Sequence, residues 1–127
     1  MSSNIIFPTN TCFDDTVEFI AQKLCNATTA EVLVLIEELI LVHAICASPE
    51  GRLYSHAWIE QGEWCYERGI LEEEAIYYAL EKAEHYAKRD VQEKFVYSLE
   101  EVFKLNEKYG NSGPWEPALQ ALCRRSK

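Results

Sequence analysis

The sequence predicts a single α+β domain in which an N-terminal helix packs on an antiparallel sheet and C-terminal helices follow. Three observations support this prediction. Apolar residues recur at helical spacing near the N-terminus, residues 40–69 read as consecutive strands, and helical patterns dominate the remainder. At 127 residues, of which 48% are hydrophobic, the chain fits one core and one domain spanning residues 1–127.

The first helix is predicted to follow the turn-prone residues 8–10, with Thr11 as its N-cap and Cys12 as its first helical residue. Thr11 precedes Asp14 by three positions, a spacing that resembles a capping box. Residues 26–29 end the element. The inward stripe consists of Phe13, Val17, Ile20 and Leu24.

The next segment is ambiguous, because Val32 to Ile36 are continuously apolar and suit either a short helix or an early strand. A helix over residues 30–39 is the preferred interpretation. The central part of the sheet is then a meander of three strands at residues 40–47, 53–60 and 63–69, the first ending at the turn 48–51.

The clearest helical pattern covers Glu72 to Arg89, with acidic residues in its first turn and basic residues at its other end, as the helix dipole favours. The remaining expected elements are a strand at residues 94–97, a helix from a Ser98/Glu101 capping box to about Tyr109, and a closing helix at residues 116–125.

The charge balance limits the partners. A net charge of −9, from 21 acidic and 12 basic residues, disfavours nucleic acid and anionic membranes and favours neutral or basic partners. No secretion signal is recognised at the N-terminus, and the apolar run Val32 to Cys46 contains charges and is too short to span a bilayer. Five cysteines without paired short spacing indicate free thiols in a reducing cytoplasm.

Residues 55–69 alternate on either side of Gln61-Gly62 and predict a β-hairpin. With those two residues as the loop, His56 lies opposite Glu67, and directly opposed Cβ atoms are roughly 5 Å apart. A carboxylate at that distance fixes one tautomer of the imidazole and stabilises its protonated form. A three-residue loop at 61–63 would turn Glu67 to the other face.

A nucleophilic thiol needs its thiolate form, which helix N-termini and nearby imidazolium groups favour. Of the five cysteines, only Cys12 is predicted at a helix start, although the charges of Asp14 and Asp15 oppose a second anion there. We therefore expect the Cys12 sulfur close to the His56 ring.

The order of a cysteine at a helix start, a strand with histidine and a strand with an acid resembles the papain-like and transglutaminase-like cysteine-enzyme superfamily. The matching stretches are residues 10–13, 56–60 and 64–67, within roughly the first seventy residues. The resemblance implies a small bacterial hydrolase or acyl transferase acting on an amide or ester of a small molecule or peptide. Cys12 would be the nucleophile, His56 the general base and acid, and Glu67 the residue that orients it. The family more often has Asp as its acid.

Two alternatives stay open. The same fold could be a non-catalytic module that binds a small molecule or protein, with Cys12 and His56 as packing residues. A zinc site from Cys65, His56 and Glu67 is a further interpretation, but paired metal-ligand spacing is lacking, so no metal and no cofactor is expected. The sequence leaves open whether the chain is a monomer or a homodimer.

Overall fold

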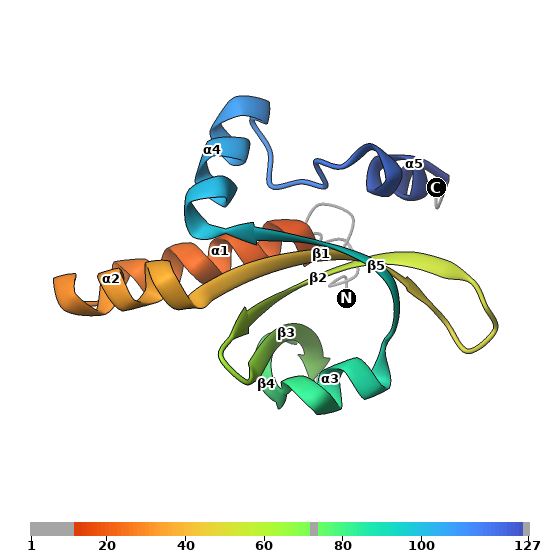
Figure 1. Cartoon of the computed structure of the whole chain (residues 1–127), viewed down its shortest axis with the longest axis horizontal. Coiled ribbons are helices and arrows are strands. Elements are labelled where there is room, and N and C mark those ends of the chain that lie inside the picture. Colours follow the sequence, from red (N-terminus) through yellow and green to blue (C-terminus); the bar gives the residue numbers. More distant parts are fainter. Residues whose placement is uncertain (1–11, 72–73, 126–127) are drawn as a thin grey trace.

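The computed structural model describes residues 12–71 and 74–125. Two helices precede four consecutive strands, and a short helix, a fifth strand and two further helices follow (Figure 1). In order they are α1 Cys12–Cys25, α2 Thr29–Glu38, β1 Leu39–Ala47, β2 Leu53–Gln61, β3 Trp64–Leu71, β4 Glu74–Glu81, α3 Lys82–Lys88, β5 Asp90–Ser98, α4 Leu99–Tyr109 and α5 Pro117–Arg125.

The five strands form one antiparallel sheet with the order β4-β3-β2-β1-β5. Helices α4 and α5 lie on one side of the strands, whereas the β3–β4 hairpin curls to the other side together with α3 (Figure 1). The α+β prediction is confirmed, including an N-terminal helix on the sheet and C-terminal helices.

Several predicted boundaries agree closely with the structure. Helix α1 begins at Cys12, although the proposed N-cap Thr11 lies outside the described residues. The ambiguous segment after it is helical, and the capping box of α4 is present, because Ser98 and Glu101 bond each other's backbone amides at 3.2 and 2.9 Å. The sequence-based interpretation of these elements is therefore confirmed.

The helix predicted over residues 72–89 is wrong for its first half. Residues 74–81 form β4, which pairs with β3, and only Lys82–Lys88 are helical. The stretch Ile76-Tyr77-Tyr78 is rich in strand-forming residues, and a hairpin partner was available in β3. Glu74 therefore belongs to a strand and not to a helix N-terminus, and Glu72 and Glu73 lie outside the described residues.

The register of the β2–β3 hairpin differs from the predicted one by two residues. Gln61 pairs with Trp64 and Ile59 with Tyr66, so the loop is Gly62-Glu63 and not Gln61-Gly62. Gly62 has a φ of 59°, in the left-handed region that glycine adopts without strain. A shift by an even number of residues keeps each side chain on its predicted face. Glu67 therefore stays on the His56 side of the sheet.

Alternation along the strands divides the core into two layers. On one face, Leu41 and Ile59 pack with Ile20 of α1 and Val102 of α4. On the opposite face, the even-numbered residues Val42, Ala44, Cys46 and Trp58 form a second cluster with Cys65. The two faces of β2 are thus buried against different elements.

One buried histidine belongs to the first layer. The side chain of His43 is fully buried among three aromatic rings. Its ring centre lies 4.6 Å from that of Phe13, 5.2 Å from that of Tyr97 and 5.1 Å from that of Trp115. Neither ring nitrogen has a hydrogen-bond partner among residues 12–71 and 74–125. Burial lowers the pKa of His43 to about 3, so the imidazole is neutral in the folded protein.

Candidate functional site

The predicted contact between His56 and Glu67 is present. Nε2 of His56 donates to Oε1 of Glu67 at 2.5 Å, and the Glu67 side chain is only 2% exposed. The contact is diagonal and not directly opposed, since β3 pairs with β2 through three residue pairs only, up to Tyr66, and then curls away with β4. That curl carries Glu67 across the sheet face toward His56.

Glu67 is shared by two further basic groups that the sequence analysis did not assign to it. Nη2 of Arg89 lies 3.1 Å from Oε1 of Glu67, and Nδ1 of the buried His85 lies 3.5 Å away. Burial alone would raise the pKa of the carboxyl, but the hydrogen bond from His56 and the nearby Arg89 charge hold it well below its usual range. Glu67 is therefore ionised at neutral pH.

Arg89 is held from a second side, because its Nη1 donates to the hydroxyl of Tyr54 at 3.1 Å. His85 lies in the last turn of α3 and Arg89 is the C-cap residue that follows the helix, and both side chains approach the same oxygen of Glu67. Helix α3 is thereby attached to β2 and β3 through one carboxylate.

A second acidic residue on this face has a similar environment. Oε2 of Glu60 accepts from Nε1 of Trp58 at 2.9 Å and from the Tyr86 hydroxyl at 2.5 Å, while Nζ of Lys82 lies 3.4 Å from its Oε1. The hydrogen bonds from Tyr86 and Trp58 and the Lys82 charge lower the pKa of Glu60 even though burial opposes this. We call Glu60, Glu67 and the groups bound to them the buried polar network.

The network leaves His56 poorly suited to accept a proton. Burial lowers the pKa of His56 more strongly than the Glu67 hydrogen bond raises it, so the ring is neutral at pH 7. Its side chain is 14% exposed. The donors around the two carboxylates join β2 and β3 to α3, which is the arrangement expected of buried acids with a structural role, although neither ring nitrogen of His85 has a hydrogen-bond partner among residues 12–71 and 74–125.

Cys12 lies on the other side of β2. The groups that influence its thiol are the backbone of Ala57, Asp15 and Cys123, and Cys123 in turn lies 3.4 Å from the Ser55 hydroxyl. Ser55 and Ala57 alternate with His56 along the strand, so they face α1 and α5. The expectation that the Cys12 sulfur approaches the His56 ring is therefore not met in the described part of the chain.

The thiol of Cys12 is also not activated. Burial raises its pKa to about 11, and Asp15 adds to this effect, while bonds from the Ala57 and Cys12 backbone oppose it. Cys12 is the first described residue of α1, and the predicted N-cap Thr11 lies outside the described residues. Desolvation of the anion outweighs the benefit of that position.

The alternative zinc set does not assemble either. Within residues 12–71 and 74–125, no group of three or more His, Cys, Asp or Glu side chains is arranged to hold a metal ion. Cys65 is fully buried in the second core layer, where burial raises its pKa to about 12. Such a thiol behaves as a packing residue.

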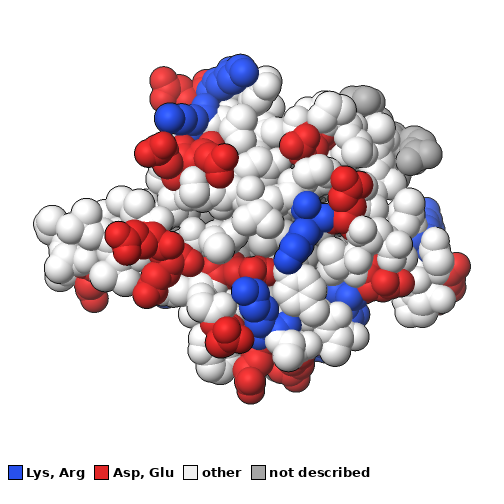
Figure 2. Space-filling model, viewed as in Figure 1, with Lys and Arg blue, Asp and Glu red and all other residues white. Residues whose placement is uncertain are grey.

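A different feature stands out on the surface. Helix α2 contains no fully buried residue, although Val32 to Ile36 are all apolar. Leu33 is 64% exposed, Val34 50% and Ile36 45%. In Figure 2 the projecting end of the molecule, where Figure 1 draws α2, is mostly uncharged with acidic residues beside it. Exposed apolar surface of this kind marks interaction sites.

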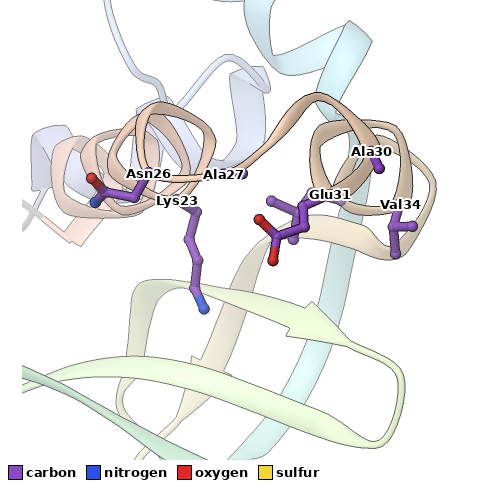
Figure 3. Close-up of a pocket in the computed structure, with 7 residues that line it drawn as sticks. Lys23, Asn26, Ala27, Ala30, Glu31 and Val34 are labelled. Atoms are coloured by element: carbon purple, nitrogen blue, oxygen red, sulfur yellow. The ribbon is translucent and has the colours of Figure 1, made fainter.

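Two hollows border this helix. The first has a volume of about 540 Å³ and lies between α1 and α2, where Lys23 extends toward the β2–β3 hairpin and Glu31 extends into the same space (Figure 3). Val34 and Leu35 line it as well. The second hollow, of about 650 Å³, lies at the C-terminal end of α2 and contains Trp64, which is 48% exposed.

We call the exposed side chains of Leu33, Val34 and Ile36, together with the two hollows, the α2 surface. The sequence analysis did not predict it, although a signal was present. A ten-residue helix with five consecutive apolar residues offers apolar side chains over much of its circumference, more than one contact face can cover.

No protein-family model, no curated protein and no solved structure matches this chain. No helix in the described ranges 12–71 and 74–125 is long and apolar enough to cross a membrane.

Proposed function

We propose that this protein is a binding module that holds an apolar segment of another protein on its α2 surface. The observation that supports this most directly is the exposure of Leu33, Val34 and Ile36 on a well-formed helix. Removing apolar surface from water is favourable by about 25 cal/mol per Å², and the part that exceeds the entropic cost of association stabilises a complex. A soluble domain rarely leaves such a cluster uncovered without a partner.

Helix α2 is already well formed in the absence of a partner. Its N-terminus has a complete capping box, in which Thr28 and Glu31 bond each other's backbone amides at 3.2 and 2.8 Å. Its C-terminal end leads directly into β1 through Leu39, which is 1% exposed. A rigid, preformed helix loses little conformational entropy on binding, and this raises affinity.

Binding accounts for the geometry better than cysteine catalysis does. A Cys-His-Glu hydrolase would need a thiolate at Cys12 beside the base His56, whereas these residues belong to opposite faces of β2 and the pKa of Cys12 is raised to about 11. The superfamily resemblance remains a hypothesis about ancestry, and the non-catalytic alternative is the function that we adopt.

A synthetic amphipathic helix with leucine on one face and glutamine on the other tests the proposal. We expect fluorescence anisotropy to show binding to the full chain. The triple variant Leu33→Gln, Val34→Gln, Ile36→Gln should weaken it at least tenfold. The matched control Leu53→Gln, Val96→Gln changes two apolar side chains of similar exposure, 45% and 50%, away from α2. Equal binding by wild type and the triple variant would refute the proposal.

A further inference from the structure

We infer that the partner segment is a basic amphipathic helix, whose Lys or Arg side chains meet the carboxylates around the α2 surface. This inference rests on the proposed function above and adds the chemistry of the partner. It depends on charge complementarity between an acidic surface and a positively charged ligand.

The charges on α2 are all of one sign. Glu31 precedes Val34 by three residues and Glu38 follows it by four, so both carboxylates lie next to Val34 on the same side of the helix. Viewed down the helix axis, Glu37 lies between Leu33 and Val34. The helix contains no Lys or Arg. A partner that covers these apolar residues therefore brings its own polar border close to these carboxylates.

The carboxylate of Glu31 keeps its charge. The bonds that Glu31 accepts from the Thr28 backbone and hydroxyl lower its pKa, so it is ionised at neutral pH. Oε1 of Glu38 accepts from the neutral amide of Gln61 at 2.9 Å, a contact that supplies no positive charge. Lys23 is the one basic residue among the described residues that line the two hollows, so further cationic groups would come from a partner.

The second hollow extends the same chemistry. Its lining combines the exposed ring of Trp64 with the carboxylates of Glu38 and Glu63. An aromatic face next to carboxylates favours a guanidinium or ammonium group, which can stack on the ring while pairing with the acids. The protein already uses this contact nearby, since Nζ of Lys23 lies 5.6 Å from the ring centres of both Phe19 and Tyr66.

The dimensions suit a helical ligand. Ten residues of α helix extend about 15 Å, which matches three turns of a partner helix with apolar residues at positions i, i+3 or i+4, and i+7. Basic residues flanking that stripe would reach Glu31 in the first half of α2 and Glu38 at its end.

A second copy of the chain fits this surface poorly. Val34 lies midway between Glu31 and Glu37, so an antiparallel α2–α2 contact centred on it would place Glu31 of each copy against Glu37 of the other. Like charges at that distance repel, and each copy carries a net charge of −9. The chain's own residues 1–11 contain no Lys or Arg and so lack the complementary charge as well.

The test compares three synthetic helices with one leucine face and a polar face of lysine, glutamine or glutamate. By fluorescence anisotropy at 50 mM salt, we expect the full chain to bind the lysine helix about tenfold more tightly than the glutamine helix, and the glutamate helix most weakly. The preference for lysine should shrink at 500 mM salt, because counterions screen exposed charges.

A charge-matched pair of variants separates local from overall electrostatics. Glu31→Gln, Glu37→Gln, Glu38→Gln should abolish most of the tenfold preference, and glutamine at position 31 retains the capping box. Glu50→Gln, Glu93→Gln, Glu107→Gln makes the same change in net charge at exposed positions elsewhere and should leave the preference intact.

The possible outcomes test the basic partner, the binding function and a homodimer separately. If the glutamine helix binds the α2 surface as tightly as the lysine helix, or if both triple variants lose the preference equally, the basic partner is refuted and the binding module stands. The proposed function fails if every synthetic helix binds the wild type no more tightly than it binds the variant Leu33→Gln, Val34→Gln, Ile36→Gln. A dimer in sedimentation velocity that Val34→Gln dissociates would show that a second copy occupies the surface, and would overturn the inference.

Discussion

The buried polar network and the α2 surface distribute polar and apolar groups in opposite ways. Beneath α3, two carboxylates sit in the interior of the sheet face, and each is surrounded by donors such as His56 and Arg89 for Glu67. On α2, apolar side chains that would suit a core point to solvent, with the ionised carboxylate of Glu31 beside them. In the first region the carboxylates find their partners within the chain, and in the second the apolar side chains do not.

This difference indicates where function resides. A buried carboxylate with two histidines invites a catalytic interpretation, but its hydrogen bonds and ion pairs are directed at α3 and the strands. Removing such groups should affect folding. Leu33 and its neighbours contribute little to the folded chain, so their substitution should affect partners instead. The following predictions test this contrast, from the largest expected effect to the smallest.

Removing the charge of Glu67 should cause the largest loss of stability. Glu67→Gln leaves Arg89 partly buried without its counter-charge and weakens the bond from His56, so we expect about 3 kcal/mol of destabilisation. Urea denaturation measures it. The same substitution at exposed Glu107 should change the free energy of unfolding by less than about 0.5 kcal/mol. A loss below about 1 kcal/mol for Glu67→Gln would mean that the network is not structural.

The reactivity of the Cys12 thiol tests the hypothesis of a cysteine enzyme. A pKa of about 11 in place of 9.0 reduces the thiolate fraction of Cys12 at neutral pH by about a hundredfold. We therefore expect iodoacetamide to modify exposed Cys25 well before Cys12, as resolved by peptide mass spectrometry. His56→Ala should not alter the rate at Cys12. Fast modification of Cys12 that depends on His56 would restore the cysteine-enzyme hypothesis.

Histidine titration should appear as a pH dependence of stability. The pKa of His43 is about 3 in the folded protein and 6.5 in the unfolded chain, so below pH 6.5 the unfolded chain binds a proton that the folded protein does not. Stability is therefore fully present above pH 6.5 and declines on acidification, by about 1.4 kcal/mol per pH unit for this group. The lowered pKa of His56 acts in the same direction.

The variant His43→Leu isolates this contribution. Between pH 6 and pH 4.5, its stability should fall about 1.4 kcal/mol per pH unit less steeply than that of the wild type. Urea denaturation at several pH values gives both slopes. An unchanged slope would place the titration elsewhere.

The smallest effect on stability is expected on α2. Leu33→Gln with Val34→Gln should change the free energy of unfolding by less than about 0.5 kcal/mol, because both side chains are at least half exposed. Leu41→Ala, at a fully buried position of β1, should cost about 3 kcal/mol. If the α2 double variant were as unstable as Leu41→Ala, α2 would be a core element and not a docking surface.

The sequence predicted elements well where local chemistry was decisive. The capping box at Ser98 located α4, and strand alternation placed His56 and Glu67 on one face. The sequence-based prediction failed where pairing with a distant strand decides the structure. Residues 74–81 have strand-forming side chains within a charge pattern typical of a helix, and only pairing with β3 selects the strand. The loop was misplaced because Gln61-Gly62 and Gly62-Glu63 both suit a turn.

By itself, the sequence determined that this is an acidic α+β chain with a histidine and a glutamate on one sheet face. Only the tertiary structure decided that Cys12 lies across the sheet from His56, that Arg89 and His85 share Glu67, and that Leu33 and Val34 stay uncovered. The physical reason is that periodicity fixes which side of its own element a residue occupies. Which element then packs against that side, and which side stays open to solvent, depends on contacts between residues far apart in the chain.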